Sequence, residues 1–145
     1  SKKARPALRD AGTIETVDTL KTARRLNTVA GDLNLTRSIS LQINSSNAPS
    51  QFGVAPEDTL ELAEQIFALP HLTLTGLMSI GANTPDEQAV RESFATTRKL
   101  AEQLRAEGHV GCRELSMGMS GDWRIAIDEG STIIRVGRQV FGERD

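Results

Sequence analysis

Residues 115–142 read LSMGMSGDWRIAIDEGSTIIRVGRQVFG and contain two places where a short predicted strand gives way to a loop. The apolar run LSMGM stops at Ser120, and a short helix is predicted directly afterwards. Ser120 and Asp122 are residue types that commonly begin helices. The β-branched run 132–136 ends at Gly137, where the backbone can approach a ligand closely. Such junctions present unpaired backbone N–H groups, so the stretch predicts two anion-binding corners on neighbouring strands.

The rest of the chain alternates predicted strands with predicted helices. The strands are expected at 14–17, 38–44, 72–80, 114–119 and 132–136, and the helices at 20–33, 57–69, 85–107 and 123–128. Single helices between strands favour parallel pairing with right-handed crossovers. The pattern predicts an α/β fold, either five strands of an eight-stranded β/α barrel or an open sheet. In such barrels, the loops after the last two strands commonly hold a ligand phosphate.

Composition indicates a folded domain and argues against several classes of protein. Hydrophobic residues make up 38% of the 145 residues, yet no apolar run is long enough to cross a membrane. No signal peptide is visible, so a cytoplasmic location is expected. The net charge of −2 and the 3% of aromatic residues do not support nucleic-acid binding.

Other reactive side chains give no catalytic or metal-binding pattern. The two histidines, His71 and His109, lack the spacing of zinc ligands and are expected at the surface. The single cysteine, Cys112, is expected to pack beside a strand. Glu15 and Asp18 are expected on opposite faces of one strand, so they do not form a paired carboxylate acid and base.

Residues 115–142 resemble, in residue type and spacing, the C-terminal signature of the pyridoxal phosphate homeostasis proteins, the YggS/PROSC family. The barrel of that family is similar to the N-terminal domain of alanine racemase. TIETVDTLKTARRLN resembles the fourth strand and helix of the family, SLQINSSNAPSQFGV its fifth strand and loop, and LTLTGLMSIGA its sixth strand. The resemblance implies that residues 1–145 form a single C-terminal part of a partial (β/α)8 TIM barrel, with strands equivalent to strands 4–8.

The length of the chain fits a part of such a barrel. A complete barrel takes about 250 residues, and strands one to three of the family have no counterpart here. The first strand of the family carries the lysine that forms a Schiff base with the cofactor. The lysines present are terminal or on predicted helices, and none ends a strand: Lys2, Lys3, Lys21 and Lys99. The resemblance therefore implies pyridoxal 5′-phosphate as the cofactor. Without the family lysine, residues 1–145 would hold it without a Schiff base.

The resemblance also implies contacts to the phosphate of the cofactor. Ser120 matches a family serine whose hydroxyl and amide touch the phosphate, although it could instead serve only as a helix cap. Gly137 and the amide of Arg138 match the second phosphate contact, although Gly137 could simply end a strand. The family often has threonine or serine at position 138. It also usually has a lysine near Gln51, and its Asn-Lys pair near the start appears here as Lys2 and Lys3.

Two further residues match family positions near the pyridine ring. Arg135 matches the arginine that faces the ring nitrogen, and the alternative is an ion pair with a nearby acid. A guanidinium only donates hydrogen bonds and stays charged, so it would hold that nitrogen unprotonated. Met78 matches a residue near the ring, with simple packing as its alternative.

Three functional hypotheses follow. The first is a non-catalytic carrier in vitamin B6 homeostasis that binds pyridoxal phosphate as its small-molecule partner. The alternative is the C-terminal barrel part of a racemase-like enzyme, but such enzymes usually need a tyrosine as well as the lysine, and the chain has no tyrosine. The third is a structural remnant without a ligand. Because an incomplete barrel leaves sheet edges, self-association or completion by a missing N-terminal segment is also expected.

Overall fold

The computed structural model describes residues 13–48 and 52–135. Within them, five strands alternate with helices: β1 (Thr13–Val17), α2 (Leu20–Asp32), β2 (Arg37–Ile43), η1 (Pro56–Asp58), α3 (Thr59–Phe67), β3 (Leu72–Ser79), α4 (Glu87–Ala106), β4 (Glu114–Met119), α5 (Trp123–Asp128) and β5 (Ile133–Arg135). All neighbouring strands pair in parallel, in the order β1-β2-β3-β4-β5. The predicted parallel α/β fold is therefore confirmed.

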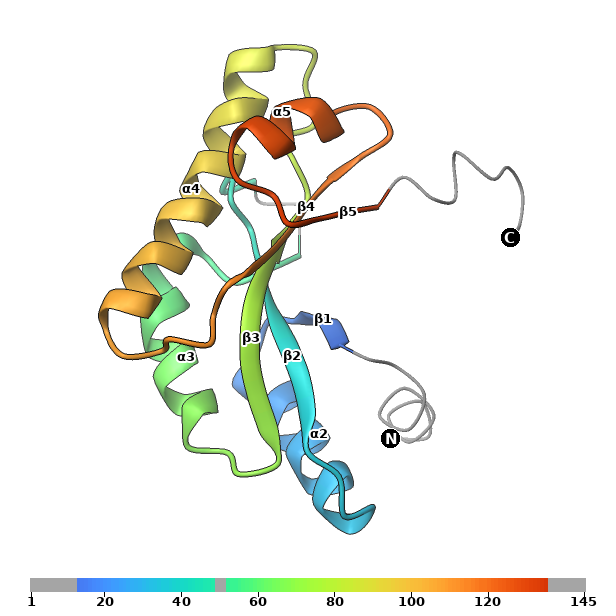
Figure 1. Ribbon diagram of the computed structural model, residues 1–145, viewed down its shortest axis with the longest axis vertical. Coiled ribbons are helices and arrows are strands. Elements are labelled where there is room, and N and C mark those ends of the chain that lie inside the picture. The colour runs from blue at the N-terminus through green and yellow to red at the C-terminus, as the bar shows by residue number, and fades with distance from the viewer. Residues whose placement is uncertain (1–12, 49–51, 136–145) are drawn as a thin grey trace, which may run out of the picture.

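The long helices lie on one side of the sheet (Figure 1). Alternate residues of the strands face them and are buried, as the spacing of apolar residues in the sequence requires. On β2 these are Ile39, Leu41 and Ile43, and on β4 they are Leu115 and Met117. Phe94 of α4 is the largest fully buried side chain in this layer. The apolar core thus holds the helices to the sheet and leaves the other face of the sheet for different residues.

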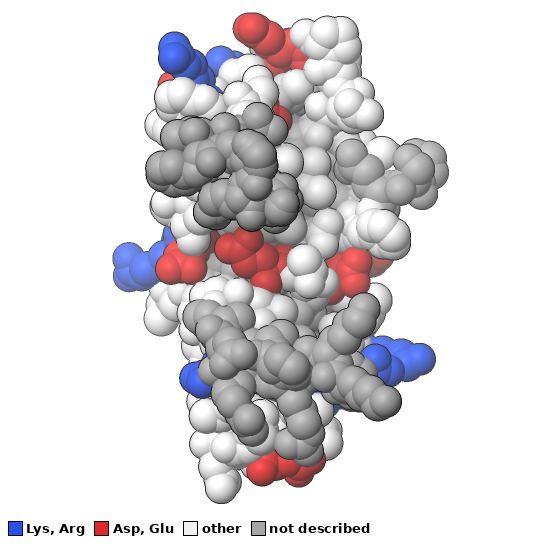
Figure 2. Space-filling view, turned by 90° about the vertical axis from the view of Figure 1, so that its right-hand side faces the viewer, with Lys and Arg blue, Asp and Glu red and all other residues white. Residues whose placement is uncertain are grey.

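The face of the sheet turned away from the helices carries mostly polar side chains. Gln42, Met78 and Ser116 lie side by side on β2, β3 and β4 in the pairing register. All three are buried, with Ser116 fully so. Figure 2 shows that acidic side chains gather across the middle of this side of the molecule. This inner face is where a barrel would be filled by side chains rather than by helices.

A hydrogen bond across the inner face shows how strongly the sheet curves. Two strands separate β1 from β4, and neighbouring strands lie about 4.8 Å apart, so β1 and β4 of a flat sheet would be about 14 Å apart. Yet Ser116 Oγ on β4 donates a hydrogen bond of 3.0 Å to Glu15 Oε1 on β1. The sheet must bend toward this face for the two side chains to meet. The five strands therefore form a parallel half-barrel.

Two details differ from the sequence-based expectations. The helix expected to begin at Pro85 begins at Glu87, because Asp86 takes the N-cap position and its Oδ1 accepts from Gln88 N at 3.0 Å. The helical spacing of apolar residues in 57–69 predicts Phe67 on the buried face of α3, but its side chain is 69% exposed. It ends the helix, and its ring instead meets the edge of the His109 ring, with 5.0 Å between centroids.

Candidate functional site

Arg135, in the last described position of β5, is held by groups from three other strands. Its Nη1 donates to Ser116 Oγ on β4 at 2.5 Å, and its Nη2 donates to the carbonyl oxygen of Ser79 on β3 at 3.2 Å. Glu15 Oε1 on β1 lies 3.8 Å from Nη1. Because Ser116 also donates to Glu15, its hydroxyl links the Glu15 carboxylate to the Arg135 guanidinium. Arg135 is thus fixed at the carboxyl end of the half-barrel.

The ion pair foreseen as an alternative role for Arg135 is present, but it does not occupy the whole guanidinium group. The side chains of Arg135 and Glu15 remain 28% and 24% exposed. A guanidinium carries five N–H donors, and hydrogen bonds between described residues use two of them. Donors therefore remain for a ligand on the inner face. The pair also offsets the positive charge in a partly buried place.

The turn after β4 places Ser120 at the surface of this end of the sheet. Ser120 is exposed and its side chain has no hydrogen-bond partner among the described residues. The N-cap position of α5 belongs to Asp122, and neither residue caps the helix with its side chain. Asp122 Oδ1 instead accepts from Met119 N at 2.8 Å and closes the turn. The helix-cap alternative for Ser120 is therefore wrong, and its hydroxyl remains open to a ligand.

Gly118 allows this turn to sit close to α5. Its φ is +104°, a backbone conformation that L side chains rarely adopt. A Cβ at this position would come within 2.8 Å of Ala126 Cβ on α5. The glycine of the run SMGM therefore brings the start of α5 against the end of β4.

Met78 lies on the inner face, in register between Gln42 and Ser116. It is 7% exposed and does not belong to the apolar core under the helices. It therefore shares a face with the groups that hold Arg135, as a residue beside a ring would. The remaining predicted contacts, Gly137 and Arg138, lie outside the described residues.

Glu15 and Ser116 were not singled out as site residues from the sequence. Local alternation does predict that Glu15 and Asp18 face opposite ways, and Asp18 indeed turns elsewhere, with its Oδ2 accepting from Gly53 N at 3.0 Å. The link between Glu15 and Ser116 spans 101 positions in sequence. Only the alternation of Ser116 with the buried Leu115 and Met117 hinted that it faces inward.

A cavity of about 330 Å³ lies next to the turn after β4. Gly121 and Asp122 line it from one side, and Thr84 and Glu87 from the other. Two acidic residues therefore line this space, which disfavours a dianionic phosphate there. A phosphate at Ser120 would have to lie on the other side of the turn.

His109 and Cys112 lie in the connection between α4 and β4, away from the Arg135 cluster. His109, expected at the surface, is only 6% exposed, with its Nε2 3.1 Å from Glu64 Oε2. That expectation was wrong because the imidazole packs against Phe67 at the end of α3. Cys112 is fully buried, as expected. Burial raises the pKa of its thiol from 9.0 to about 11, and the nearby Arg105 lowers it by less.

The described residues hold no cluster of three or more histidine, cysteine or acidic side chains that could bind a metal ion. Among them there is also no helix with the length and apolar character needed to span a membrane. The site is therefore characterised by one fixed guanidinium, a polar inner face and an exposed serine turn.

Comparison with known proteins agrees with this geometry. Residues 1–145 match the family described as alanine racemase, N-terminal domain. A pyridoxal phosphate homeostasis protein of Vibrio cholerae is 42% identical over 132 residues, which are 91% of this chain and 56% of that protein. The chain belongs to the family of the alanine racemase N-terminal domain. The homonymous protein of Pseudomonas aeruginosa is 40% identical over 145 residues, which are 100% of this chain and 61% of that protein. The resemblance found in the sequence is confirmed, and the chain spans less than two thirds of these relatives.

Solved structures share the same arrangement of strands and helices. PipY of Synechococcus elongatus with PLP bound has a TM-score of 0.86 and 35% identity, covering 97% of this chain and 66% of that one. An unknown protein from Bifidobacterium adolescentis has a TM-score of 0.93 and 38% identity, covering 97% and 56%. An alanine racemase of Clostridium difficile, at 17% identity and a TM-score of 0.80, supports the fold alone.

Proposed function

We propose that this chain is part of a non-catalytic pyridoxal phosphate carrier and binds the cofactor at the carboxyl end of its half-barrel. The observation that carries the proposal is Arg135, which groups from β1, β3 and β4 fix on the inner face while the described residues leave donors of its guanidinium unused. The homeostasis relatives and the PLP-bound PipY structure support the choice of ligand. As part of this proposal, residues 1–145 form a single C-terminal part of a barrel domain of the family. The strands β1 to β5 then correspond to strands 4–8 of that barrel.

Each proposed contact uses a different part of the ligand. Arg135 donates to the ring nitrogen and, being permanently charged, disfavours its protonation. Met78 packs against the ring. Ser120 and the amides of Gly137 and Arg138 bind the phosphate, which suits short backbone and hydroxyl donors. A pyridine ring with an unprotonated nitrogen is a poorer electron sink, which suits a carrier or a racemase-like site better than a decarboxylase.

The residues present fit the phosphate and ring-nitrogen ends of the cofactor better than its aldehyde. The described lysines, Lys21 and Lys99, are exposed on α2 and α4 and do not face the inner side of the sheet. The chain also contains no tyrosine to serve as an opposing proton donor. The racemase-like alternative therefore has no catalytic pair in these residues, and we do not favour it.

The proposal is tested with 4-deoxypyridoxine 5′-phosphate, which keeps the ring and phosphate but lacks the aldehyde and cannot form an imine. Calorimetric titration of the chain should show saturable binding. Ser120→Ala should weaken it about tenfold, because a hydrogen bond to a charged group contributes about 1.5–3 kcal/mol. Thr132→Ala serves as the matched control. The hydroxyl of Thr132 accepts from Leu115 N beside the pairing of β4 and β5, and it is not among the proposed ligand contacts. Equal affinities for both variants and the parent chain would overturn the assignment of Ser120.

A further inference from the structure

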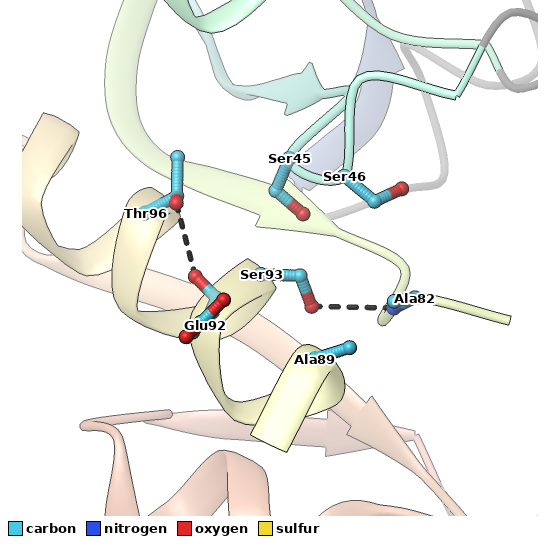
Figure 3. Close-up of a pocket in the computed structure, with 7 residues that line it drawn as sticks. All are labelled: Ser45, Ser46, Ala82, Ala89, Glu92, Ser93 and Thr96. Carbon is cyan, nitrogen blue, oxygen red and sulfur yellow. Dashed lines mark hydrogen bonds between the residues drawn. The ribbon is translucent and has the colours of Figure 1, made fainter. Parts of the chain in front are cut away.

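A second cavity lies between the loop after β2 and the outer helix α4, and none of the proposed cofactor contacts lines it. Its volume is about 380 Å³. Figure 3 shows its walls, which are formed by Ser45, Ser46, Ala82, Ala89, Glu92, Ser93 and Thr96. We call it the hydroxyl cavity, because four of these seven side chains carry a hydroxyl group. It opens at the carboxyl ends of β2 and β3.

Ser45 is a buried polar side chain without a partner. It is 8% exposed, and its Oγ makes no hydrogen bond within the described part of the chain. In Figure 3 this hydroxyl points from the loop into the space beside Ser93 of α4. Leaving a buried hydroxyl unpaired costs about 1–3 kcal/mol. A ligand group that reaches Ser45 would recover that free energy.

Two hydroxyl groups of α4 face the same space with their hydrogens already engaged. Ser93 Oγ donates to the carbonyl oxygen of Val90 at 2.7 Å and accepts from Ala82 N at 3.2 Å, so one lone pair of this oxygen is left. Thr96 Oγ1 donates to the carbonyl oxygen of Glu92 at 2.9 Å. A hydroxyl has one hydrogen to donate and two lone pairs. Ser93 and Thr96 can therefore offer only lone pairs to a ligand.

The carboxylate of Glu92 adds negative charge at the same wall. One of its oxygens accepts from Gln88 Nε2 at 3.2 Å, and this exposed side chain forms no ion pair among the described residues. The residues that line the cavity include no lysine, arginine or histidine. The wall is therefore rich in hydrogen-bond acceptors, negatively charged and without a cation of its own.

We propose that the hydroxyl cavity binds the primary ammonium group of a small amine. Such a group carries one positive charge and three N–H donors and has no lone pair to clash with the acceptors. Ser45, Ser93 and Thr96 accept its hydrogens, and Glu92 supplies the opposite charge. This inference goes beyond the proposed cofactor site and does not depend on it.

The test uses ethanolammonium as the probe and amide chemical shifts of the isotope-labelled chain as the readout. The amides of Ser45, Ser93 and Thr96 should shift together and saturate. Tetramethylammonium has the same charge but no N–H donor, and potassium chloride tests a bare cation. Neither should reproduce the shifts. The proposal would be overturned if tetramethylammonium or potassium produced the same saturable shifts. It would also be overturned if ethanolammonium produced no saturation.

Matched variants locate the binding residues. Ser45→Ala and Glu92→Gln should each weaken ethanolammonium binding about fivefold. Glu102→Gln, which makes the same charge change further along α4, should leave it within about twofold. Circular dichroism checks the fold of each variant. If Ser45→Ala does not fold, Glu92→Gln decides, because its side chain is exposed, and an unchanged affinity for that variant would contradict the proposal.

Discussion

At the scale of single residues, the hydroxyl of Ser116 joins the two charged side chains of the candidate site. It accepts from Arg135 and donates to Glu15 on the far strand of the half-barrel. Because Ser116 is fully buried, this geometry is shielded from competition by bulk water. Ser116 is therefore a positioning residue, which acts on a ligand through the orientation of Arg135.

Substitution of Ser116 by alanine tests this role. We expect the affinity for 4-deoxypyridoxine 5′-phosphate to fall about fivefold to tenfold, since the loss of one hydrogen bond is worth about 1 kcal/mol or slightly more. Benzyl phosphate, which has a ring and a phosphate but no ring nitrogen, should bind the Ser116→Ala variant and the parent chain equally. A parallel loss for both ligands would show that the variant perturbs the fold instead of the orientation of Arg135.

Cys112 gives a second prediction at this scale, from the rise of its pKa to about 11. Two pKa units lower the thiolate fraction at pH 8 about a hundredfold, so iodoacetamide should react far more slowly with the folded chain than with the chain in denaturant. Since folding favours the protonated thiol, its contribution to stability is full below pH 9 and is lost as the pH rises toward 11. The single cysteine makes the measurement unambiguous, and equal alkylation rates in both states would contradict the burial.

At the scale of elements, the corner between β4 and α5 depends on a glycine that no other residue can replace without strain. Gly118 combines φ +104° with a close approach to Ala126 on α5. The neighbouring Gly121 has open space around it. The two positions lie in the same corner, and they separate the effect of backbone geometry from that of any added methyl group.

The substitutions Gly118→Ala and Gly121→Ala form a matched pair. The first should lower the free energy of unfolding by about 2–4 kcal/mol, because it adds backbone strain and a steric clash. The second should change it by no more than about 0.5 kcal/mol. Urea denaturation followed by circular dichroism measures both. Comparable losses for the two variants would show that the corner does not require this glycine.

Much of the element pattern could be predicted from local sequence, since β-branched runs and helical spacing act over short stretches. The bounds of β4 and α5 match the predicted ranges, whereas α4 begins at Glu87 and not at Pro85 because Asp86 takes the N-cap position. Within the candidate site, Arg135 and Met78 could be placed by resemblance. The link between Glu15 and Ser116 could not, because it arises from the curvature of three intervening strand pairings.

At the scale of the whole molecule, the described sheet has two edge strands, β1 and β5, and each pairs on one side only within residues 13–48 and 52–135. Parallel edges present unpaired backbone groups that favour pairing with another chain. A closed barrel would remove both edges. The 145-residue chain taken alone is therefore expected to associate, either with itself or with a segment that supplies further strands.

Light scattering of the purified chain tests this association. The apparent mass should exceed 15.7 kDa and should rise with protein concentration. Charged substitutions at the β1 edge, such as Thr13→Lys, should reduce the rise, because charged edge residues oppose strand pairing. A constant monomeric mass over a wide range of concentration would contradict the expected association without affecting the proposed ligand.

The measurement that tests the proposed function most directly is a crystal structure of the chain with 4-deoxypyridoxine 5′-phosphate. The proposal predicts the phosphate within hydrogen-bond distance of Ser120 and of the amides of Gly137 and Arg138. It also predicts the ring nitrogen facing Arg135, with Met78 beside the ring. A phosphate bound at any other place, or a ring nitrogen turned away from Arg135, would contradict the assignment of this end of the half-barrel to the cofactor.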